Sequence, residues 1–200
     1  MLSLAKKLAT LSLLASSLTA FAQNDISLGH PAYGGNGCPN GTAQASLSPD
    51  GKALSVIFDQ FVTEAGPGSG RTIDRKSCNI AVPVYVPGGY SISILAVDYR
   101  GYVGLPAGAT ARIQAEYFFA GMTGPRFAQE FRGRTDQDYT FNNTLGVQAM
   151  VWSPCGAAVN LRVNASMMVR NSTHLDAIAT VDSADFSAGI IYQIQMRRCN

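Results

Sequence analysis

Residues 75–105, RKSCNIAVPVYVPGGYSISILAVDYRGYVGL, decide how we interpret the fold of this chain. Two apolar runs lie on either side of Pro87, Gly88 and Gly89, and apolar residues occupy every second position of the first run. This period of two is typical of a half-buried β-strand. We therefore predict a β-hairpin around the Pro-Gly-Gly segment, followed by an aromatic and basic turn at residues 98–102.

The chain outside this stretch has the same period. Residues 45–62 contain two apolar runs around the turn signal Ser-Pro-Asp-Gly, which predicts a second hairpin whose second strand is covered on both faces. Alternation at residues 111–119 and 159–170 predicts two strands with one buried face each. Residues 121–144 are the most polar and irregular, and we predict a variable loop there with a short strand near 127–131.

Two local features interrupt the alternation within the central stretch. Pro83 cannot donate a ladder hydrogen bond, which indicates an edge strand or a bulge. The apolar residues change phase between Ile94 and Leu95, which indicates a second bulge or burial on both faces.

Short strands separated by turn signals, without a convincing helix after residue 22, predict an all-β fold. We expect an antiparallel β-sandwich of about eight to ten strands, because several strands are apolar on both faces whereas a small barrel would alternate throughout. The chain contains no internal repeat and no long linker. Residues 23–200 are therefore predicted to form a single domain, and residues 23–43 its loop-rich N-terminal arm.

Residues 1–22 have the layout of a cleavable signal peptide. Lys6 and Lys7 begin it, residues 8–18 are mostly apolar, and Ala-Phe-Ala ends it. The apolar part is shorter than the roughly 20 residues that a membrane span needs. We predict a secreted, extracellular protein without a membrane anchor after cleavage, located in the periplasm or at the cell surface if the source is bacterial.

The charge of the exported part is balanced. The full sequence has 15 Lys and Arg against 13 Asp and Glu, and two of the basic residues, Lys6 and Lys7, lie in the predicted signal peptide. Residues 23–200 therefore carry 13 of each sign and are formally neutral. Binding of nucleic acid needs a clustered basic face. We predict no nucleic-acid partner.

All four cysteines follow the signal peptide and would enter an oxidising compartment, where disulfides form. Four cysteines allow three pairings, and spacing alone cannot choose among them. We favour Cys38–Cys78 and Cys155–Cys199, one bridge in each half. A zinc site is the alternative, but no Cys-x-x-Cys or histidine spacing supports it.

Five short motifs and a C-terminal cysteine occur in a characteristic order. They are residues 34–39 (GGNGCP), 48–51 (SPDG), 75–78 (RKSC), 98–102 (DYRGY) and 152–156 (WSPCG), with Cys199 after them. Together they resemble the secreted family known as domain of unknown function 4360, which occurs in fungi and bacteria. The resemblance implies a secreted, all-β, cysteine-linked domain and the disulfide pairing favoured above. It implies no catalytic residues.

The sequence offers no convincing catalytic set, and we predict no catalytic residue, cofactor or metal. His30 and His174 fall in loop-like segments, and the cysteines are assigned to disulfides. Aspartates at 136–138 and 182–185 lack the spacing of a calcium loop. A glycosidase needs two carboxylates at a defined separation, and Glu116 or a pair of aspartates leaves that possibility open.

The aromatic and basic residues Tyr99, Arg100 and Tyr102 are our candidate ligand-binding residues, because aromatic rings and guanidinium groups form stacking platforms. Tyr33 and Trp152 would extend such a platform. A second candidate is the outward row of the predicted strand at 159–170, namely Asn160, Arg162, Asn164 and Ser166. Each set is equally consistent with a purely structural role.

We therefore expect a secreted, non-catalytic β-sandwich protein that binds an extracellular polymer, such as a polysaccharide, or a surface protein. One alternative is a structural component of an extracellular coat or matrix. The other is a secreted hydrolase that uses a carboxylate pair.

Overall fold

A computed structural model of the chain describes residues 25–146, 150–181 and 190–199. The predicted signal peptide, residues 1–22, lies outside these ranges, as does the aspartate pair at 182–185. The described residues form two antiparallel sheets and no helix, so none of them forms a helix that could cross a membrane. The all-β prediction is confirmed. The single-domain organisation of residues 23–200 stays a prediction.

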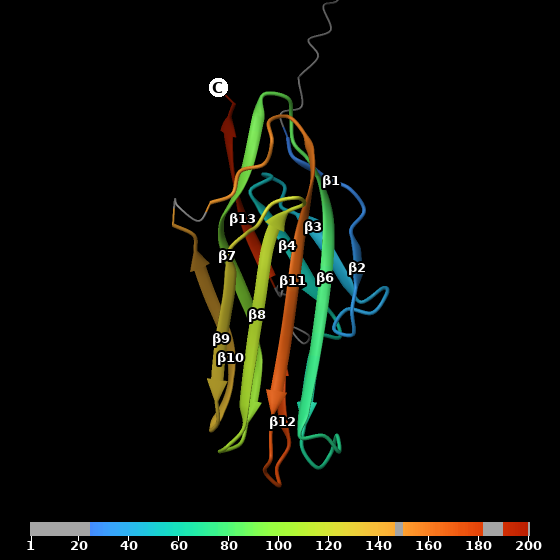
Figure 1. The fold of residues 1–200 in the computed structure, drawn as a ribbon, viewed down its shortest axis with the longest axis vertical. Coiled ribbons are helices and arrows are strands. Elements are labelled where there is room, and N and C mark those ends of the chain that lie inside the picture. The colour runs from blue at the N-terminus through green and yellow to red at the C-terminus, as the bar shows by residue number, and fades with distance from the viewer. Residues whose placement is uncertain (1–24, 147–149, 182–189, 200) are drawn as a thin grey trace, which may run out of the picture.

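The six-stranded sheet has the order β1-β6-β11-β8-β9, with β2 also paired to β6. Its strands are β1 (Ser27–Leu28), β2 (Ala32–Gly34), β6 (Ile73–Tyr85), β8 (Thr110–Phe119), β9 (Arg126–Arg132) and β11 (Ala158–Arg170). Figure 1 shows β6, β11, β8 and β9 side by side along the long axis of the molecule.

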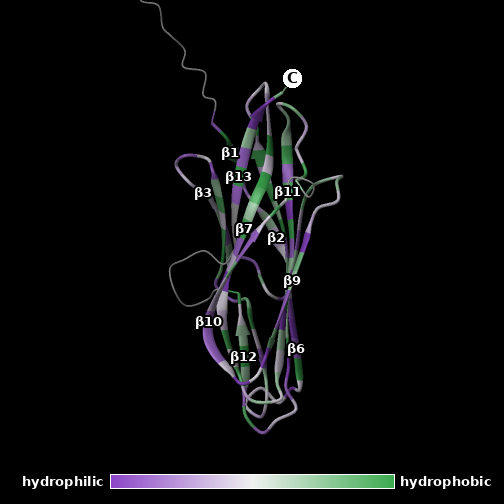
Figure 2. Ribbon diagram, turned by 90° about the vertical axis from the view of Figure 1, so that its left-hand side faces the viewer, coloured by the Kyte–Doolittle hydropathy of each residue, from purple (hydrophilic) through white to green (hydrophobic). Residues whose placement is uncertain are grey.

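The seven-stranded sheet has the order β3-β4-β13-β7-β12-β5, with β10 also paired to β7. Its strands are β3 (Ala43–Leu47), β4 (Ala53–Phe58), β5 (Val62–Ala65), β7 (Tyr90–Leu105), β10 (Thr135–Thr144), β12 (Ala177–Thr180) and β13 (Ile190–Arg198). Figure 2 shows the two sheets edge-on as two layers. This is the predicted sandwich, with more strands than expected because very short strands complete both sheets.

The core lies between the sheets and follows the predicted alternation. Strand β8 buries every second residue from Ala111 to Phe119, and β11 does the same from Leu161 to Val169. Buried apolar side chains from both sheets form one cluster. Each apolar side chain removed from water contributes roughly 1.5 to 3 kcal/mol, so this alternation is the main reason that the strands stack in two layers.

The hairpin predicted around Pro87, Gly88 and Gly89 is wrong. Strand β6 belongs to the six-stranded sheet and β7 to the seven-stranded sheet, so the two strands do not pair. The Pro-Gly-Gly segment instead carries the chain from one layer to the other, as the upper end of Figure 1 shows. Two apolar strands joined by a short turn can form a hairpin in one sheet or can connect two stacked sheets. The sequence does not distinguish these arrangements, because the same residues are buried in each.

The turn predicted at residues 98–102 is also wrong, because this segment lies inside the 16-residue strand β7. Gly101 is needed there for space and not for a turn. The Tyr139 hydroxyl passes over it and donates a 2.7 Å hydrogen bond to the carbonyl of Thr180, and a Cβ on Gly101 would collide with both groups. A glycine inside a strand often marks such a close approach.

The bulge predicted from the change of phase in the central stretch is confirmed. Ile194 of β13 pairs with Ile94, whereas Gln193 pairs with Ala96, so Leu95 is an extra residue in β7. One extra residue exchanges the two faces of a strand beyond it. This explains why the apolar residues of β7 change phase at Leu95.

The prediction of a loop at residues 121–144 is wrong, whereas the short strand predicted within it is present. Strands β9 and β10 occupy most of the segment, and β9 includes the predicted strand near 127–131. Strand β9 pairs with β8, and β10 pairs with β7, so the segment also connects the two sheets. The hairpin predicted at 45–62 is present as β3 and β4, although Ile57 is exposed and β4 is buried on one face only.

The disulfides join Cys38 to Cys78 and Cys155 to Cys199, which is the pairing favoured from the sequence. The first bridge is fully buried and ties the N-terminal arm to β6. In the second, Cys155 is exposed and Cys199 is half-buried. The bridges close loops of similar length, with sequence separations of 40 and 44 residues. Both should therefore reduce the entropy of the unfolded chain, and so stabilise the fold, by similar amounts.

A mild reductant should therefore open Cys155–Cys199 before Cys38–Cys78. Thiol–disulfide exchange requires access to a sulfur atom, and the two arginines beside Cys199 favour the thiolate that forms. Stepwise reduction, alkylation and peptide mass mapping measure the order. Repeating the reduction in denaturant should remove the difference, and preferential opening of Cys38–Cys78 in the folded protein would contradict this prediction.

Polar aromatic side chains bridge the two sheets at the centre of the core. Tyr117 of β8 is 1% exposed, and its hydroxyl accepts a 3.0 Å hydrogen bond from the side-chain amide of Asn143 on β10. Burial raises the pKa of Tyr117 to about 12, although hydrogen bonds with Tyr99 and Asn143 act in the opposite direction. The neutral phenol is therefore the form that the fold accommodates.

This shift of pKa predicts a loss of stability in alkali. An unfolded tyrosine ionises near pH 10, so Tyr117 contributes about 2 to 3 kcal/mol that is fully present below pH 10 and is lost as the pH rises through about 12. Urea unfolding at a series of alkaline pH values measures this loss. Tyr117→Phe should show a smaller decrease than the unmodified protein, and parallel decreases would contradict the assignment to Tyr117.

Candidate functional site

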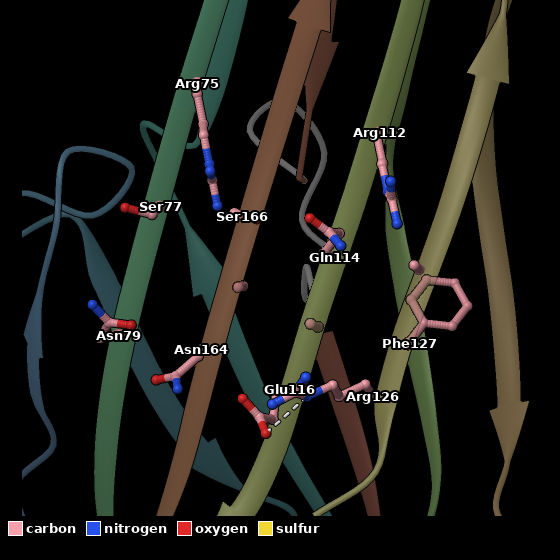
Figure 3. A pocket seen from close by; sticks show the side chains of 13 residues that line it. Arg75, Ser77, Asn79, Arg112, Gln114, Glu116, Arg126, Phe127, Asn164 and Ser166 are labelled. Atoms are coloured by element: carbon pink, nitrogen blue, oxygen red, sulfur yellow. Dashed lines mark hydrogen bonds and ion pairs between the residues drawn. The ribbon is translucent and has the colours of Figure 1, made fainter.

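A hollow lies on the outer face of the six-stranded sheet. It has a volume of about 480 Å³ and is lined by β6, β11, β8 and β9. Its floor consists of the polar side chains Ser77, Asn79, Gln114, Asn164 and Ser166, as Figure 3 shows. We call this hollow the polar trough.

Strand register places these side chains next to one another. Asn164 of β11 pairs with Asn79 of β6, and Ser166 pairs with Ser77 on one side and Gln114 on the other. Residues that share a row across a sheet point to the same face. Because the intervening residues of the same strands are apolar and buried, the polar ones have to face outward.

Most of the polar groups on the floor have no hydrogen-bond partner in the described part of the chain. Among the described residues, the side chains of Asn79, Gln114, Asn164 and Ser166 make no hydrogen bond, whereas Ser77 contacts Asn36. Each amide offers two donor positions and one acceptor oxygen, and the serine hydroxyl offers a donor and an acceptor. The trough therefore presents mixed donors and acceptors to a ligand.

Charged residues border the floor. Arg126 donates a 3.1 Å hydrogen bond to Glu116, which is the single carboxylate among the residues that line the trough. Arg75 and Arg112 are exposed, and neither forms an ion pair within the described part of the chain. The border is therefore positively charged overall.

The wall on the β9 side is supported from the core. Phe127 lines the trough and stacks on Tyr99 of the other sheet, with ring centroids 4.2 Å apart and an angle of 10° between the ring planes. A stacked aromatic pair contributes about 0.5 to 1.5 kcal/mol beyond the burial of area. The position of β9 at the edge of its sheet thus depends on a contact between the two layers.

The chain resembles known proteins over almost all of its described length. Residues 24–199 match the model of a family described as a domain of unknown function, DUF4360. The chain belongs to this family. An uncharacterized secreted protein of Arthroderma benhamiae is 34% identical over 169 residues, which cover 84% of this chain and 69% of that protein. The comparison confirms the resemblance described above and supports secretion of the chain.

The structure changes the interpretation of the candidate residues at 99–102. Tyr99 is fully buried, so it cannot contact a ligand. Tyr102 points outward and donates a 2.7 Å hydrogen bond to Asp136, which raises the pKa of Tyr102. Arg100 is half-buried, and its Nε atom is buried without a hydrogen-bond partner among the described residues. The prediction is wrong for Tyr99 because adjacent residues of a strand face opposite sides.

Tyr33 and Trp152 do not complete an aromatic platform around Tyr102. Tyr33 lies on β2 of the six-stranded sheet, where its hydroxyl accepts a 2.8 Å hydrogen bond from the backbone of Gly41. The guanidinium carbon of Arg197 lies 3.9 Å from the centre of the Trp152 ring. Since Tyr102 belongs to the other sheet from Tyr33, the three aromatic residues do not share one sheet face.

The two histidines weighed for catalysis lie in different segments of the fold. His30 and His174 are both exposed, on the N-terminal arm and in the connection after β11. Among the described residues, no group of three or more His, Cys, Asp or Glu side chains is placed to hold a metal ion. A two-carboxylate mechanism in the trough would need a partner for Glu116, and the other lining residues do not supply one.

Sequence reasoning found only part of the trough. The outward row of β11 contributes Asn164 and Ser166, whereas Asn160 and Arg162 lie on the same strand outside the lining. Of the lining residues on β6, β8 and β9, sequence reasoning singled out only Glu116, and that as a candidate carboxylate of a hydrolase. Their alternation with apolar residues was visible, but only the pairing of β6 and β8 with β11 brings these polar residues together.

Replacement of the two tyrosines should separate their roles. We expect Tyr99→Ala to lower the free energy of unfolding by about 3 kcal/mol or more, because it leaves a cavity where a buried ring stood. Tyr102→Ala removes a surface hydrogen bond and should cost about 1 kcal/mol. Denaturant unfolding followed by circular dichroism measures both. Similar losses in the two variants would contradict the assignment of Tyr99 to the core.

Proposed function

We propose that this protein is a secreted, non-catalytic binding protein and that the polar trough binds an extracellular polysaccharide. One observation carries the proposal: an open hollow on the sheet holds amide and hydroxyl groups without partners in the described part of the chain. Polar groups on a surface acquire a specific role when they converge on one hollow, because a ligand can then pair with several of them at once.

The chemistry of the floor suits a sugar chain. Sugars present hydroxyl groups that both donate and accept hydrogen bonds, and the side-chain amides of Asn79 and Gln114 do the same. Neighbouring strands are about 4.8 Å apart, a spacing comparable with the length of one sugar ring. A polysaccharide lying across the strands would therefore meet another polar side chain at each ring, in the order Ser77, Ser166 and Gln114.

Secretion and the presence of a single carboxylate in the lining of the trough agree with a binding role. A secreted protein meets the polysaccharides of cell surfaces and matrices, and we propose the cell exterior, including a cell surface, as the place of binding. Glu116 is already bound to Arg126, so it serves to hold β8 and β9 together at the border of the trough.

A screen of soluble polysaccharides with the mature protein tests this proposal. For any polysaccharide that binds, Asn79→Ala combined with Gln114→Ala should weaken binding roughly tenfold or more, because two sets of hydrogen bonds are lost. Isothermal titration calorimetry measures the affinity. Both residues are exposed, so we expect the fold to remain intact, and circular dichroism checks this.

Gln44→Ala is the matched control. Gln44 is exposed on β3 in the other sheet, so its removal should leave binding unchanged. Failure of the protein to bind any polysaccharide in a broad screen would overturn the proposed function. Equal losses in the control and in the trough variant would place the binding surface elsewhere.

A further inference from the structure

We infer that the trough selects acidic polysaccharides and holds a sugar carboxylate between Arg75 and Arg112. This inference rests on the proposed function and adds the chemical class of the ligand. The observation behind it is the arrangement of arginines on the outer face of the six-stranded sheet. These arginines distinguish acidic from neutral sugars, which the amide and hydroxyl groups of the floor do not.

The two arginines flank a single position of the central strand. Arg75 of β6 and Arg112 of β8 both pair with Met168 of β11, from opposite sides. Two strand spacings of about 4.8 Å separate their backbones. In Figure 3 both guanidinium groups are directed along the sheet toward the row that contains Ser166 and Gln114. Both cations therefore border the same part of the floor.

Neither arginine has a counter-ion in the described part of the chain. The two glutamates on this face already form ion pairs, Glu116 with Arg126 and Glu130 with Arg132. Arg162 and Arg170 on β11 are also exposed and form no ion pair among the described residues. The outward positions of β6, β8, β9 and β11 thus carry six arginines and two glutamates.

This excess of positive charge is local and not a property of the whole chain. Residues 23–200 contain equal numbers of acidic and basic residues. When charges of one sign are concentrated on a single face, they attract ligands of the opposite charge and raise the rate at which these ligands associate. Guanidinium groups pair with carboxylates through two parallel hydrogen bonds, while the neutral groups of the floor remain available to the sugar hydroxyls.

Polygalacturonate and its fully methyl-esterified form provide a direct test, because they share a backbone and differ in charge. We expect the mature protein to bind polygalacturonate at least about tenfold more tightly than the ester, since the ester cannot accept a charged bidentate pair. Raising the salt concentration from about 0.05 M to about 0.5 M should weaken binding of the acidic form, because exposed charges are screened, and should affect the ester little.

Charge-neutral variants locate the effect. Arg75→Gln and Arg112→Gln should each weaken binding of polygalacturonate roughly tenfold while leaving binding of the ester unchanged. Arg198→Gln is the matched control, because Arg198 is exposed on β13 of the other sheet and its removal changes the net charge by the same amount. The control should bind like the unmodified protein.

The possible failures are distinguishable. Equal binding of acid and ester would overturn the acidic preference and leave polysaccharide binding in place, whereas failure to bind any polysaccharide would overturn both. Equal weakening by Arg198→Gln would show a diffuse charge effect and overturn the site. Self-association of the protein that Arg75→Gln abolishes, without binding of polymer, would assign this face to a second copy of the chain and overturn the inference.

Discussion

The stack of Phe127 on Tyr99 is the contact on which the arrangement of the trough depends. It joins β9, at the edge of one sheet, to β7 of the other sheet. Next to it, Tyr117 and Asn143 form a hydrogen bond between the layers. An edge strand is held on one side only by its ladder, so contacts through the core fix where β9 lies, and with it the wall of the trough.

The same alternation builds the core and the trough. Along the trough, β6, β8 and β11 give apolar side chains to the interior and polar side chains to the outer face. Because a slip of one residue would exchange the two faces, burial of Ile113 and Val163 also determines where Gln114 and Asn164 point. The polar groups of the trough are thereby placed by the hydrophobic core, without needing hydrogen bonds of their own.

Charge is distributed unevenly over a chain that is neutral as a whole. The outer face of the six-stranded sheet holds arginines that form no ion pair in the described part of the chain. On the outer face of the other sheet, Asp98 and Asp136 accept hydrogen bonds from Asn142 and Tyr102. The formal charge of the chain gives no hint of this, because it sums over both faces. The proposed acidic polysaccharide would therefore recognise a property of one sheet face.

The sequence by itself determined the strands with a clear period of two and the family. It also showed the change of phase at Leu95 and favoured, without deciding, the disulfide pairing that the structure has. These depend on local periodicity, on short motifs and on cysteine content, all of which can be counted along the chain. Only the tertiary structure decided that β6 and β7 enter different sheets, that Tyr99 faces inward, and that Arg75 and Arg112 flank one position of β11. The physical reason is that a strand buries the same residues whichever partner it pairs with, so its alternation does not reveal its neighbours.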